Sequence, residues 1–272
     1  AAPNMTAAST NNLKVYLEQI IDNDSYRNYK NIEELQRVSA WIKEQMRLFG
    51  IPCQYQNYLV NSLGYRNVVC TLNAGHADKV IVGAHYDVLG EQQGADDNAS
   101  GVAGVIETAR ILAQQKSQLM QNIEFVFYTL QEPPFFKTEQ MGSYIHAKSV
   151  QTQKDQIQGV YILDMIGYFD EKLVQDYPVG LKWVYPNHAN YIAAVSNVQS
   201  YDLGAKYCEA MRTLNRLECQ RLVAPSFVSG MEFSDHLNYW KFDIPAVMIT
   251  DTAFFRNKNY HTEKDTLKTL NI

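Results

Sequence analysis

Five side chains that could bind divalent metal ions stand beside the ends of predicted strands or the start of a predicted helix. Two are histidines and three are carboxylates: His85, Asp97, Glu132, Asp164 and His261. This set contains too many oxygen ligands for a structural zinc site, which prefers closed shells of cysteine and histidine. It suits a pair of divalent cations, so the chemistry that it predicts is that of a two-metal site.

A two-metal site needs an anionic bridge, because cations about 3.5–4 Å apart repel each other. Asp97 is the central candidate, since one carboxylate can offer an oxygen to each ion. Asp87 follows His85 by two residues and is placed to accept the second imidazole N–H of that histidine. Asp96 has a simpler interpretation, as an acidic residue in the loop or at the start of a helix.

The five positions share one structural location. In an open α/β sheet, ligands bind beyond the carboxyl ends of the strands. His85 closes the nearly all-apolar run KVIVGAH, Glu132 follows EFVFYTLQ, and Asp164 closes GVYILD. Asp97 lies just before a predicted helix, and the strand IPAVMIT leads into the loop that reaches His261. We therefore expect all five side chains to meet at one edge of a sheet.

Helices and strands alternate along the predicted chain. The predicted helices cover 12–23, 31–49, 100–116, 139–150, 187–197 and 201–213, with a short helix from about Ser234 and a helical start in EKDTLKTLNI. The predicted strands cover 53–60, 66–72, 79–85, 123–130, 159–163 and 244–250. This alternation is typical of a three-layer α/β/α sandwich with a mixed, mostly parallel central sheet. The first two strands would form an antiparallel hairpin at one edge.

Length and composition fit a single domain that spans residues 1–272. The net charge of -5 and the pI of about 5.7 argue against nucleic acid or an anionic membrane as a partner. No apolar run approaches the roughly 20 residues that cross a bilayer. The chain opens with AAPNMTAAST, which fits the trimmed start of an exported protein and equally a cytosolic terminus.

The cysteines allow two interpretations. Cys53, Cys70, Cys208 and Cys219 include no CxxC pair, so a cysteine-type zinc site is not expected. They could be four buried thiols. They could also form disulfides, for which the local pairs 53–70 and 208–219 are the easiest to close, and which would place the protein outside the cytoplasm.

A series of short motifs resembles one known family. The motifs are HYD, GADDNASG, the glutamate before PP, LDMIGY and YHTEKDT, in this order between His85 and Thr266. Together they resemble the co-catalytic di-zinc aminopeptidases, among them the secreted bacterial leucyl-type enzymes. That family also includes glutamate carboxypeptidases and is related to glutaminyl cyclases.

The resemblance implies a role for each candidate residue. His85 and Asp164 would hold one zinc ion, and Glu132 and His261 would hold a second. Asp97 would bridge the two ions, commonly with a cis peptide bond to the next residue. We expect Asp87 to orient His85. Tyr260 matches a tyrosine that in some members hydrogen-bonds the tetrahedral intermediate, and it could equally be an aromatic residue that covers the site.

The resemblance also implies an activity. Two zinc ions per chain would activate water for attack on the first peptide bond of a substrate with a free N-terminus. We expect a monomer that is secreted or periplasmic and has no nucleic-acid or membrane partner. A final helix would follow near Ile272 in relatives. Phe135 and Phe136 could rim the substrate pocket or pack in the core.

Gln131 departs from the family pattern. The residue before the glutamate ligand is normally a second glutamate, which takes a proton from water and passes it to the leaving amine. An amide can bind that water but cannot accept its proton, so we expect this chain to bind substrate and turn over very slowly. Either the chain is a deliberate Glu→Gln variant, or it is a natural pseudoenzyme. The five intact candidate ligands favour the first explanation.

Two other functions stay open. A glutaminyl cyclase would use the same fold with one working zinc, and a non-catalytic protein would only bind peptides. The sequence GADDNASG and the full ligand set favour the peptidase. Several other polar residues have ordinary interpretations and receive no role: His236, with Ser234 or Asp235 as an N-cap, and His76, His146 and His188. A serine hydrolase is not expected, because no GxSxG motif is present.

Overall fold

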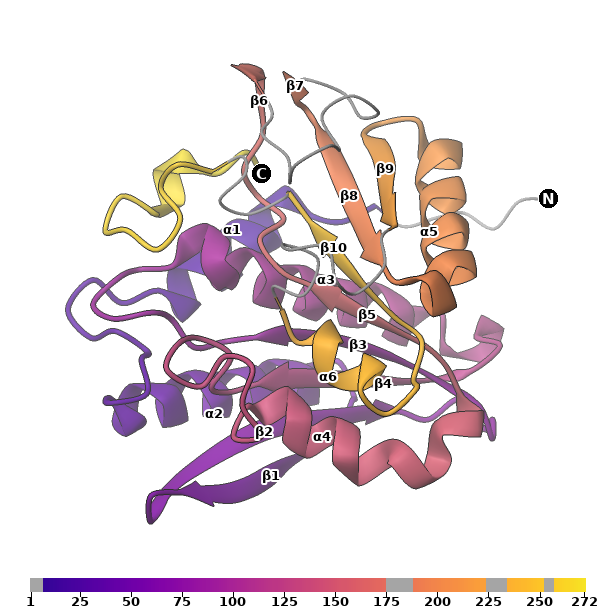
Figure 1. Cartoon of the computed structure of the whole chain (residues 1–272), viewed down its shortest axis with the longest axis horizontal. Coiled ribbons are helices and arrows are strands. Elements are labelled where there is room, and N and C mark those ends of the chain that lie inside the picture. The colour runs from indigo at the N-terminus through magenta and orange to yellow at the C-terminus, as the bar shows by residue number, and fades with distance from the viewer. Residues whose placement is uncertain (1–6, 175–187, 224–233, 252–256) are drawn as a thin grey trace.

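The structure is a computed structural model, and it describes residues 7–174, 188–223, 234–251 and 257–272 (Figure 1). An eight-stranded sheet forms its centre, with the order β1-β2-β4-β3-β5-β10-β8-β9. The strands are β1 (Cys53–Val60), β2 (Leu63–Leu72), β3 (Lys79–His85), β4 (Asn122–Tyr128), β5 (Ile157–Leu163), β8 (Tyr191–Ser196), β9 (Glu218–Val223) and β10 (Ala246–Thr250). A separate two-stranded ladder pairs β6 (Asp170–Val174) with β7 (His188–Ala189).

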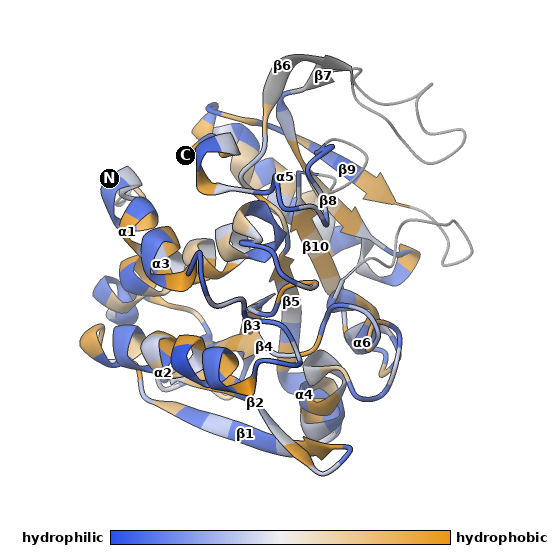
Figure 2. Ribbon diagram, turned by 90° about the vertical axis from the view of Figure 1, so that its left-hand side faces the viewer, coloured by the Kyte–Doolittle hydropathy of each residue, from blue (hydrophilic) through white to orange (hydrophobic). Residues whose placement is uncertain are grey.

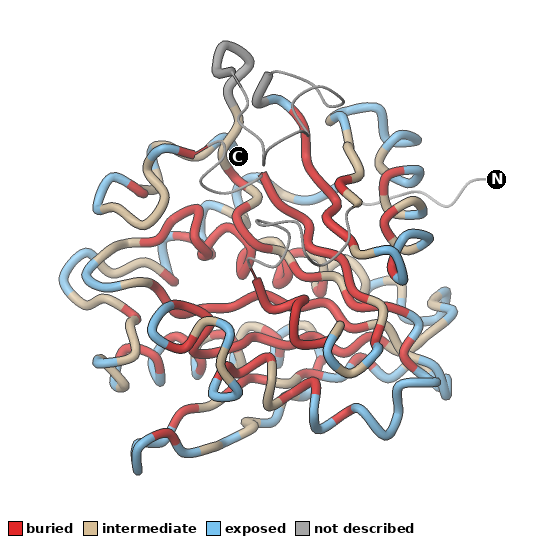
Figure 3. Tube along the Cα trace, viewed as in Figure 1, coloured by how far each residue is buried: buried red, intermediate tan, exposed pale blue. Residues whose placement is uncertain are grey.

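The sheet is mixed and mostly parallel, as predicted. Strand β3 runs parallel to both β4 and β5, and β10 runs parallel to β5. The hairpin β1–β2 adds two antiparallel strands at one edge, and β8 joins β10 in the antiparallel direction. The central strands are buried along their length, which Figure 3 shows in red. Near-continuous apolar runs such as that of β3 suit this position, because both faces of a central strand are covered.

Helices cover both faces of the sheet. They are α1 (Thr10–Ile20), α2 (Ile32–Leu48), α3 (Gly101–Gln114), α4 (Gly142–Val150), α5 (Tyr201–Leu214) and α6 (His236–Trp240). Alternate residues of β5 point to opposite faces, as in any strand. Leu163 packs with the clusters of α1–α3 and of α5, whereas Ile162 packs with α4 and α6. The molecule is therefore a three-layer α/β/α sandwich.

Helix α2 shows why these sequences form these elements. Its buried side chains Leu35, Val38, Ile42 and Met46 recur every three or four residues and face the sheet. The Asn31 side chain caps its start by accepting from the Glu34 N–H at 3.3 Å. Figure 2 shows the resulting alternation of hydrophobic and hydrophilic bands along the helices. Burial of one apolar stripe thus fixes the face that each helix turns to the sheet.

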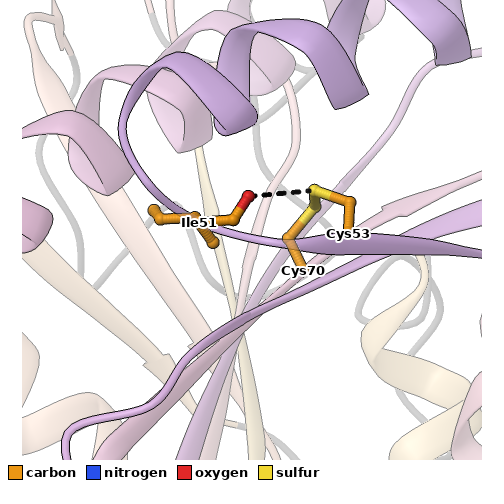
Figure 4. The surroundings of a disulfide bond; sticks show 3 residues. All are labelled: Ile51, Cys53 and Cys70. Atoms are coloured by element: carbon orange, nitrogen blue, oxygen red, sulfur yellow. Dashed lines mark hydrogen bonds between the residues drawn. A yellow bond between two sulfur atoms is a disulfide. The ribbon is translucent and has the colours of Figure 1, made fainter.

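Both predicted cysteine pairs are disulfides. Cys53 and Cys70 are directly opposite each other on β1 and β2, with Cα atoms 4.0 Å apart (Figure 4). The carbonyl oxygen of Ile51 lies 3.8 Å from Cys53 Sγ. The second disulfide joins Cys208 of α5 to Cys219 of β9. The interpretation of four buried thiols is therefore excluded.

The C-terminal third departs from the prediction. The helix predicted over 187–197 is wrong, because 191–196 is the buried strand β8 between β10 and β9. Its sequence YIAAVS is uniformly apolar, and periodicity cannot distinguish a short buried strand from a helix. Strand β9 was not predicted, and EKDTLKTLNI forms only the short turn Leu267–Thr269 within the described residues. Residue 187, the first residue of that predicted helix, lies outside the described residues.

Candidate metal centre

The five candidate side chains meet beyond the carboxyl ends of the central strands. They form two groups that share Asp97: one with His85 and Asp164, the other with Glu132 and His261. Within each group, one potential ligand atom per residue lies within 4.8 Å of the others. His85 is the last residue of β3, Asp164 follows β5, and Glu132 follows the turn after β4. Neighbouring parallel strands therefore deliver three of the five.

Asp97 offers a different oxygen to each histidine. Its Oδ1 lies 3.2 Å from His85 Nε2, and its Oδ2 lies 2.9 Å from His261 Nε2. On the outer sides, Asp164 Oδ2 is 3.5 Å from His85 Nε2, and Glu132 Oε2 is 2.8 Å from His261 Nε2. This is the arrangement that a carboxylate bridging two cations requires.

Asp87 orients His85. The imidazole Nδ1 of His85 lies 3.1 Å from the Asp87 carboxylate and 3.2 Å from the Asp87 carbonyl oxygen. A carbonyl can only accept a hydrogen bond, so Nδ1 is the donor, and Nε2 is the ring nitrogen that faces Asp97. The Asp87 carboxylate also accepts from the backbone N–H groups of Gln131 and Glu132, each at 3.1 Å. One buried carboxylate therefore fixes two of the strand ends relative to each other.

The segment that carries Asp97 is irregular and buried. Residues Ala95–Ser100 form a distorted helical turn before α3, and the peptide bond between Asp97 and Asn98 is cis, as the resemblance implied. The Asn98 side chain donates to the Leu163 carbonyl at 2.9 Å and accepts from the Met165 N–H at 2.9 Å. A Cβ at Gly101 would collide with that carbonyl and with Asn98, so α3 begins in direct contact with the end of β5.

Two site residues were missed by the sequence reasoning. Asp265, within the motif YHTEKDT, accepts from the backbone N–H groups of Asp96 and Asp97 at 2.8 and 3.0 Å. Ser234 Oγ donates to Asp164 Oδ2. Both act over long sequence separations, so only their short motifs could have pointed to them. Asp96 has the structural role that was predicted, since it accepts from the Gly167 N–H at 2.9 Å.

Backbone strain accompanies the site. Leu130, Met165 and His261 all have positive φ angles, of 55°, 56° and 55°. Non-glycine residues rarely adopt this conformation, and it concentrates at functional sites. Leu130 precedes Glu132 by two residues and Met165 directly follows Asp164. A sharp backbone turn therefore lies within two residues of Glu132, next to Asp164 and at His261.

Burial and mutual proximity shift the pKa of most of the titratable groups at the site. Burial and the neighbouring Asp97 raise the pKa of Glu132 well above its ordinary value, and burial also raises the pKa of Asp164. Burial opposes the charge on His261, yet the carboxylates of Asp97 and Glu132 raise its pKa to about 10. Burial likewise opposes the charge on His85, and the acids around it nevertheless raise its pKa well above the ordinary value. In electrostatic terms, the carboxylates favour any positive charge placed among them.

The donor set fits metal ions on geometric grounds as well. Among the buried side-chain atoms of the described residues that have no hydrogen-bond partner, three belong to candidate ligands: His85 Nε2, Glu132 Oε1 and His261 Nε2. Carboxylate oxygens approach both imidazole nitrogens, but the angles are not those of hydrogen bonds. Buried polar atoms are nearly always hydrogen-bonded in proteins, so these orphans require another partner. Imidazole and carboxylate ligands in open groups of three are typical of hydrolytic zinc sites.

The two remaining predicted residues border the metal groups. Gln131 is buried and directly precedes Glu132. The Tyr260 ring stacks on the His261 imidazole with 3.7 Å between the ring centroids. Burial and the nearby carboxylates raise the pKa of Tyr260, so its hydroxyl stays protonated and can donate.

None of the other histidines whose side chains are described belongs to either group. His76 is exposed near the carbonyl of Leu119, and His146 is buried against Glu124. His236 packs edge-on against Trp240, 4.6 Å between centroids. The side chain of His188 lies outside the described residues.

Residues 67–272 match the sequence pattern of peptidase family M28. The chain belongs to this family. The uncharacterized protein YfbL of Escherichia coli K12 is 38% identical over 255 residues, which cover 90% of this chain and 77% of that protein. Leucine aminopeptidase 1 of Pyrenophora tritici-repentis is 24% identical over 292 residues, covering 100% of this chain and 68% of the relative. The M28 chain thus has named aminopeptidases among its more distant relatives.

Solved structures share the fold of this M28 chain. The Legionella pneumophila LapA aminopeptidase matches with a TM-score of 0.74 and 20% identity, covering 97% of this chain and 67% of that one. The glutaminyl cyclase of Porphyromonas gingivalis matches with a TM-score of 0.72 and 18% identity, covering 97% and 92%. At these identities the likeness establishes the fold alone. The fold is therefore common to an aminopeptidase and to a glutaminyl cyclase.

Proposed function

We propose that this protein is a zinc-dependent aminopeptidase that binds two zinc ions per chain and removes the first residue of peptides. The observation that carries this proposal is the pair of histidine–carboxylate groups that share Asp97 through different oxygens. His85 and Asp164 would hold one ion, Glu132 and His261 the other, and Asp97 would bridge them. A single-metal site would not need a carboxylate with one oxygen facing each histidine.

When bound, a pair of divalent cations polarises a carbonyl and lowers the pKa of water to near neutrality. The chain's own residues supply the rest. Carboxylates around the groups attract the free ammonium group of a substrate, which limits cleavage to the first peptide bond. Tyr260 would donate a hydrogen bond to the oxyanion that forms at the scissile carbonyl.

A cavity of about 660 Å³ lies at the segment that follows Glu132 and would offer room for a peptide. Pro133 and Pro134, which directly follow Glu132, line it together with Tyr29. Phe135 does not rim this space, because it is buried in the core against Tyr29, 5.1 Å between ring centroids. Pro133 and Pro134 therefore replace Phe135 as candidate contacts for substrate, and Phe136, which is half-buried, stays a candidate.

Gln131 would make this chain a slow enzyme. An amide at this position can hydrogen-bond water but cannot take its proton, and general acid–base catalysis is typically worth about 10²–10⁴-fold. We infer that restoring the carboxylate in Gln131→Glu raises turnover of aminoacyl-nitroanilides by at least about 100-fold. The metal content should stay at two zinc ions per chain, because Gln131 is not a proposed ligand.

The same measurements separate the alternatives. A single tightly held zinc per chain, with conversion of N-terminal glutamine to pyroglutamate, would favour a glutaminyl cyclase. Two zinc ions without any gain in hydrolysis for Gln131→Glu would favour a protein that only binds peptides.

The disulfides bear on where the protein acts. Disulfides form and persist in oxidising compartments, and they are rare in the cytosol. The bonds Cys53–Cys70 and Cys208–Cys219 therefore support a secreted or periplasmic protein. None of the described helices is long and apolar enough to cross a membrane. Retention of activity in an oxidising buffer and its loss after reduction would agree with this location.

A further inference from the structure

Arg27 lies in the connection between α1 and α2, outside the residues that match the family pattern, and its side chain is fully buried. We propose that Arg27 is a positioning residue that holds the loop carrying Asp87 and Asp97 in its metal-binding shape. This inference rests on the proposed metal site. It adds a residue from the N-terminal segment to a centre whose candidate ligands all lie between residues 85 and 261.

The guanidinium group donates to the loop at both ends. Nε donates to the Tyr86 carbonyl at 2.8 Å, one residue after His85. Nη1 and Nη2 donate to the carbonyls of Gln93 and Gly94 at 2.6 and 2.9 Å, four and three residues before Asp97. A planar group with donors in a fixed fork can join these three carbonyls, whereas a lysine offers one point charge.

The backbone around Arg27 extends the same contact. The Val88 N–H donates to the Arg27 carbonyl at 3.1 Å, and the Asn28 side chain donates to the Gly90 carbonyl at 2.9 Å. Gly94 has a φ of 58°, and a Cβ there would meet the Arg27 guanidinium at 3.2 Å. The same Cβ would collide with the Asp97 carbonyl oxygen and with Val88, so the loop packs tightly on itself and against Arg27 at this point.

Charge explains why an arginine can occupy this buried place. Burial lowers the pKa of Arg27 to about 10, against the opposing influence of Asp265, Asp87 and Asp97. The group therefore stays charged at neutral pH. Asp265 accepts from the N–H groups at the Asp97 end of the same loop. The positive Arg27 therefore donates to the carbonyl groups of the loop, and the negative Asp265 accepts from its N–H groups.

Loss of this contact should weaken metal binding without removing a ligand. Groups that orient metal ligands typically change metal affinity by about 10–100-fold when they are mutated. For Arg27→Met we expect the zinc Kd, measured by competition with a chromophoric chelator, to rise by about 10–100-fold. For Arg27→Lys, which keeps the charge but not the fork, we expect a rise of about 10-fold.

Arg37→Met is the matched control. Arg37 also lies near the N-terminus and donates to two backbone carbonyls, those of Gln19 and Ile20, but it does not contact the loop. It should lower the unfolding temperature and leave the zinc Kd within twofold of the unaltered chain. If Arg27→Met does not fold, Arg27→Lys decides the question.

Zinc affinity of Arg27→Lys within twofold of the unaltered chain would overturn the inference, and so would an equal loss of affinity in Arg37→Met. If the unaltered chain itself bound no zinc, the proposed function would fail first, and the positioning role would fail with it. The three outcomes are therefore distinguishable.

Discussion

At the residue scale, Asp97 has a position that no other described residue shares. It is the only member of both metal-binding groups found among the described residues, and each of its oxygens faces a different histidine. Loss of any one of the other four candidate ligands would leave the second group of three, which includes Asp97, complete. The whole proposal therefore depends most directly on this side chain.

Asp97→Asn should remove zinc from the protein. The amide keeps the size of the carboxylate but offers one weak oxygen ligand and no charge, so the cations would lose their anionic bridge. We expect the zinc content after dialysis to fall from two ions per chain to one or none, and the remaining affinity to drop by more than about 100-fold. Atomic absorption on the dialysed protein would measure it.

Asp235→Asn provides a control for that change. Asp235 is also a buried carboxylate near the centre, and burial raises its pKa to about 7, but it belongs to neither group of candidate ligands. This variant should keep two zinc ions per chain. Retention of both ions by Asp97→Asn would contradict the bridging role.

At the scale of elements, the ends of strands could be predicted and the contacts between distant segments could not. Local patterns located β3, β4 and β5, because short apolar runs that end in a polar residue mark buried parallel strands. The same rule failed for 191–196, where a buried apolar run was interpreted as a helix. Periodicity carries no information on which strand a segment will pair with.

The supporting residues of the site show the same limit. Arg27, Asp265 and Ser234 each bond to a segment that is 59 or more residues away in sequence. No local sequence pattern predicts such a contact, because the two segments come together only when the sheet has formed. Candidate ligands could be listed from the chain, whereas the groups that orient them needed the structure.

Glu124 joins three elements and should make stability depend on acid pH. It lies on β4, accepts from Lys79 of β3 at 2.6 Å, and lies 2.5 Å from His146 of α4. Burial would raise its pKa, but His146 and Lys79 lower it to about 2 from 4.5. A carboxylate with a depressed pKa stabilises the fold above pH 4.5, and this contribution disappears as the pH falls towards 2.

Glu124→Gln should therefore flatten the acid side of the stability curve. Between pH 7 and pH 2 the unaltered chain should lose about 3 kcal/mol more unfolding free energy than the variant, as a shift of this size implies. Urea titrations at several pH values would measure it. Glu44→Gln is the control, because the pair of Glu44 with Arg47 is exposed and should contribute little. Parallel curves for all three proteins would contradict this reading of Glu124.

At the scale of the whole molecule, covalent bonds secure the edges of the sheet and the proposed ions secure its centre. The disulfide Cys53–Cys70 joins the edge strand β1 to β2, and Cys208–Cys219 ties the opposite edge strand β9 to α5. His85 ends β3, whereas Glu132, Asp164 and His261 follow β4, β5 and β10 along the chain. Asp97 precedes α3, so none of the five lies on an edge strand. Metal binding would therefore hold together parts of the chain that no disulfide connects.

Zinc should consequently stabilise the folded protein against heat. A ligand that binds only the native state adds about 2.7 kcal/mol per site at a free concentration of 100 times Kd. For a domain of this size, each kcal/mol raises the unfolding temperature by roughly 2–4 °C. Two sites should raise it by at least about 10 °C, and EDTA should reverse the shift. Scanning calorimetry with intact disulfides would measure both.

Asp97→Asn is the control for this effect. The variant should show little of the rise in unfolding temperature, because it lacks the carboxylate that both ions would share. An equal rise in Asp97→Asn would mean that zinc stabilises the fold from another place.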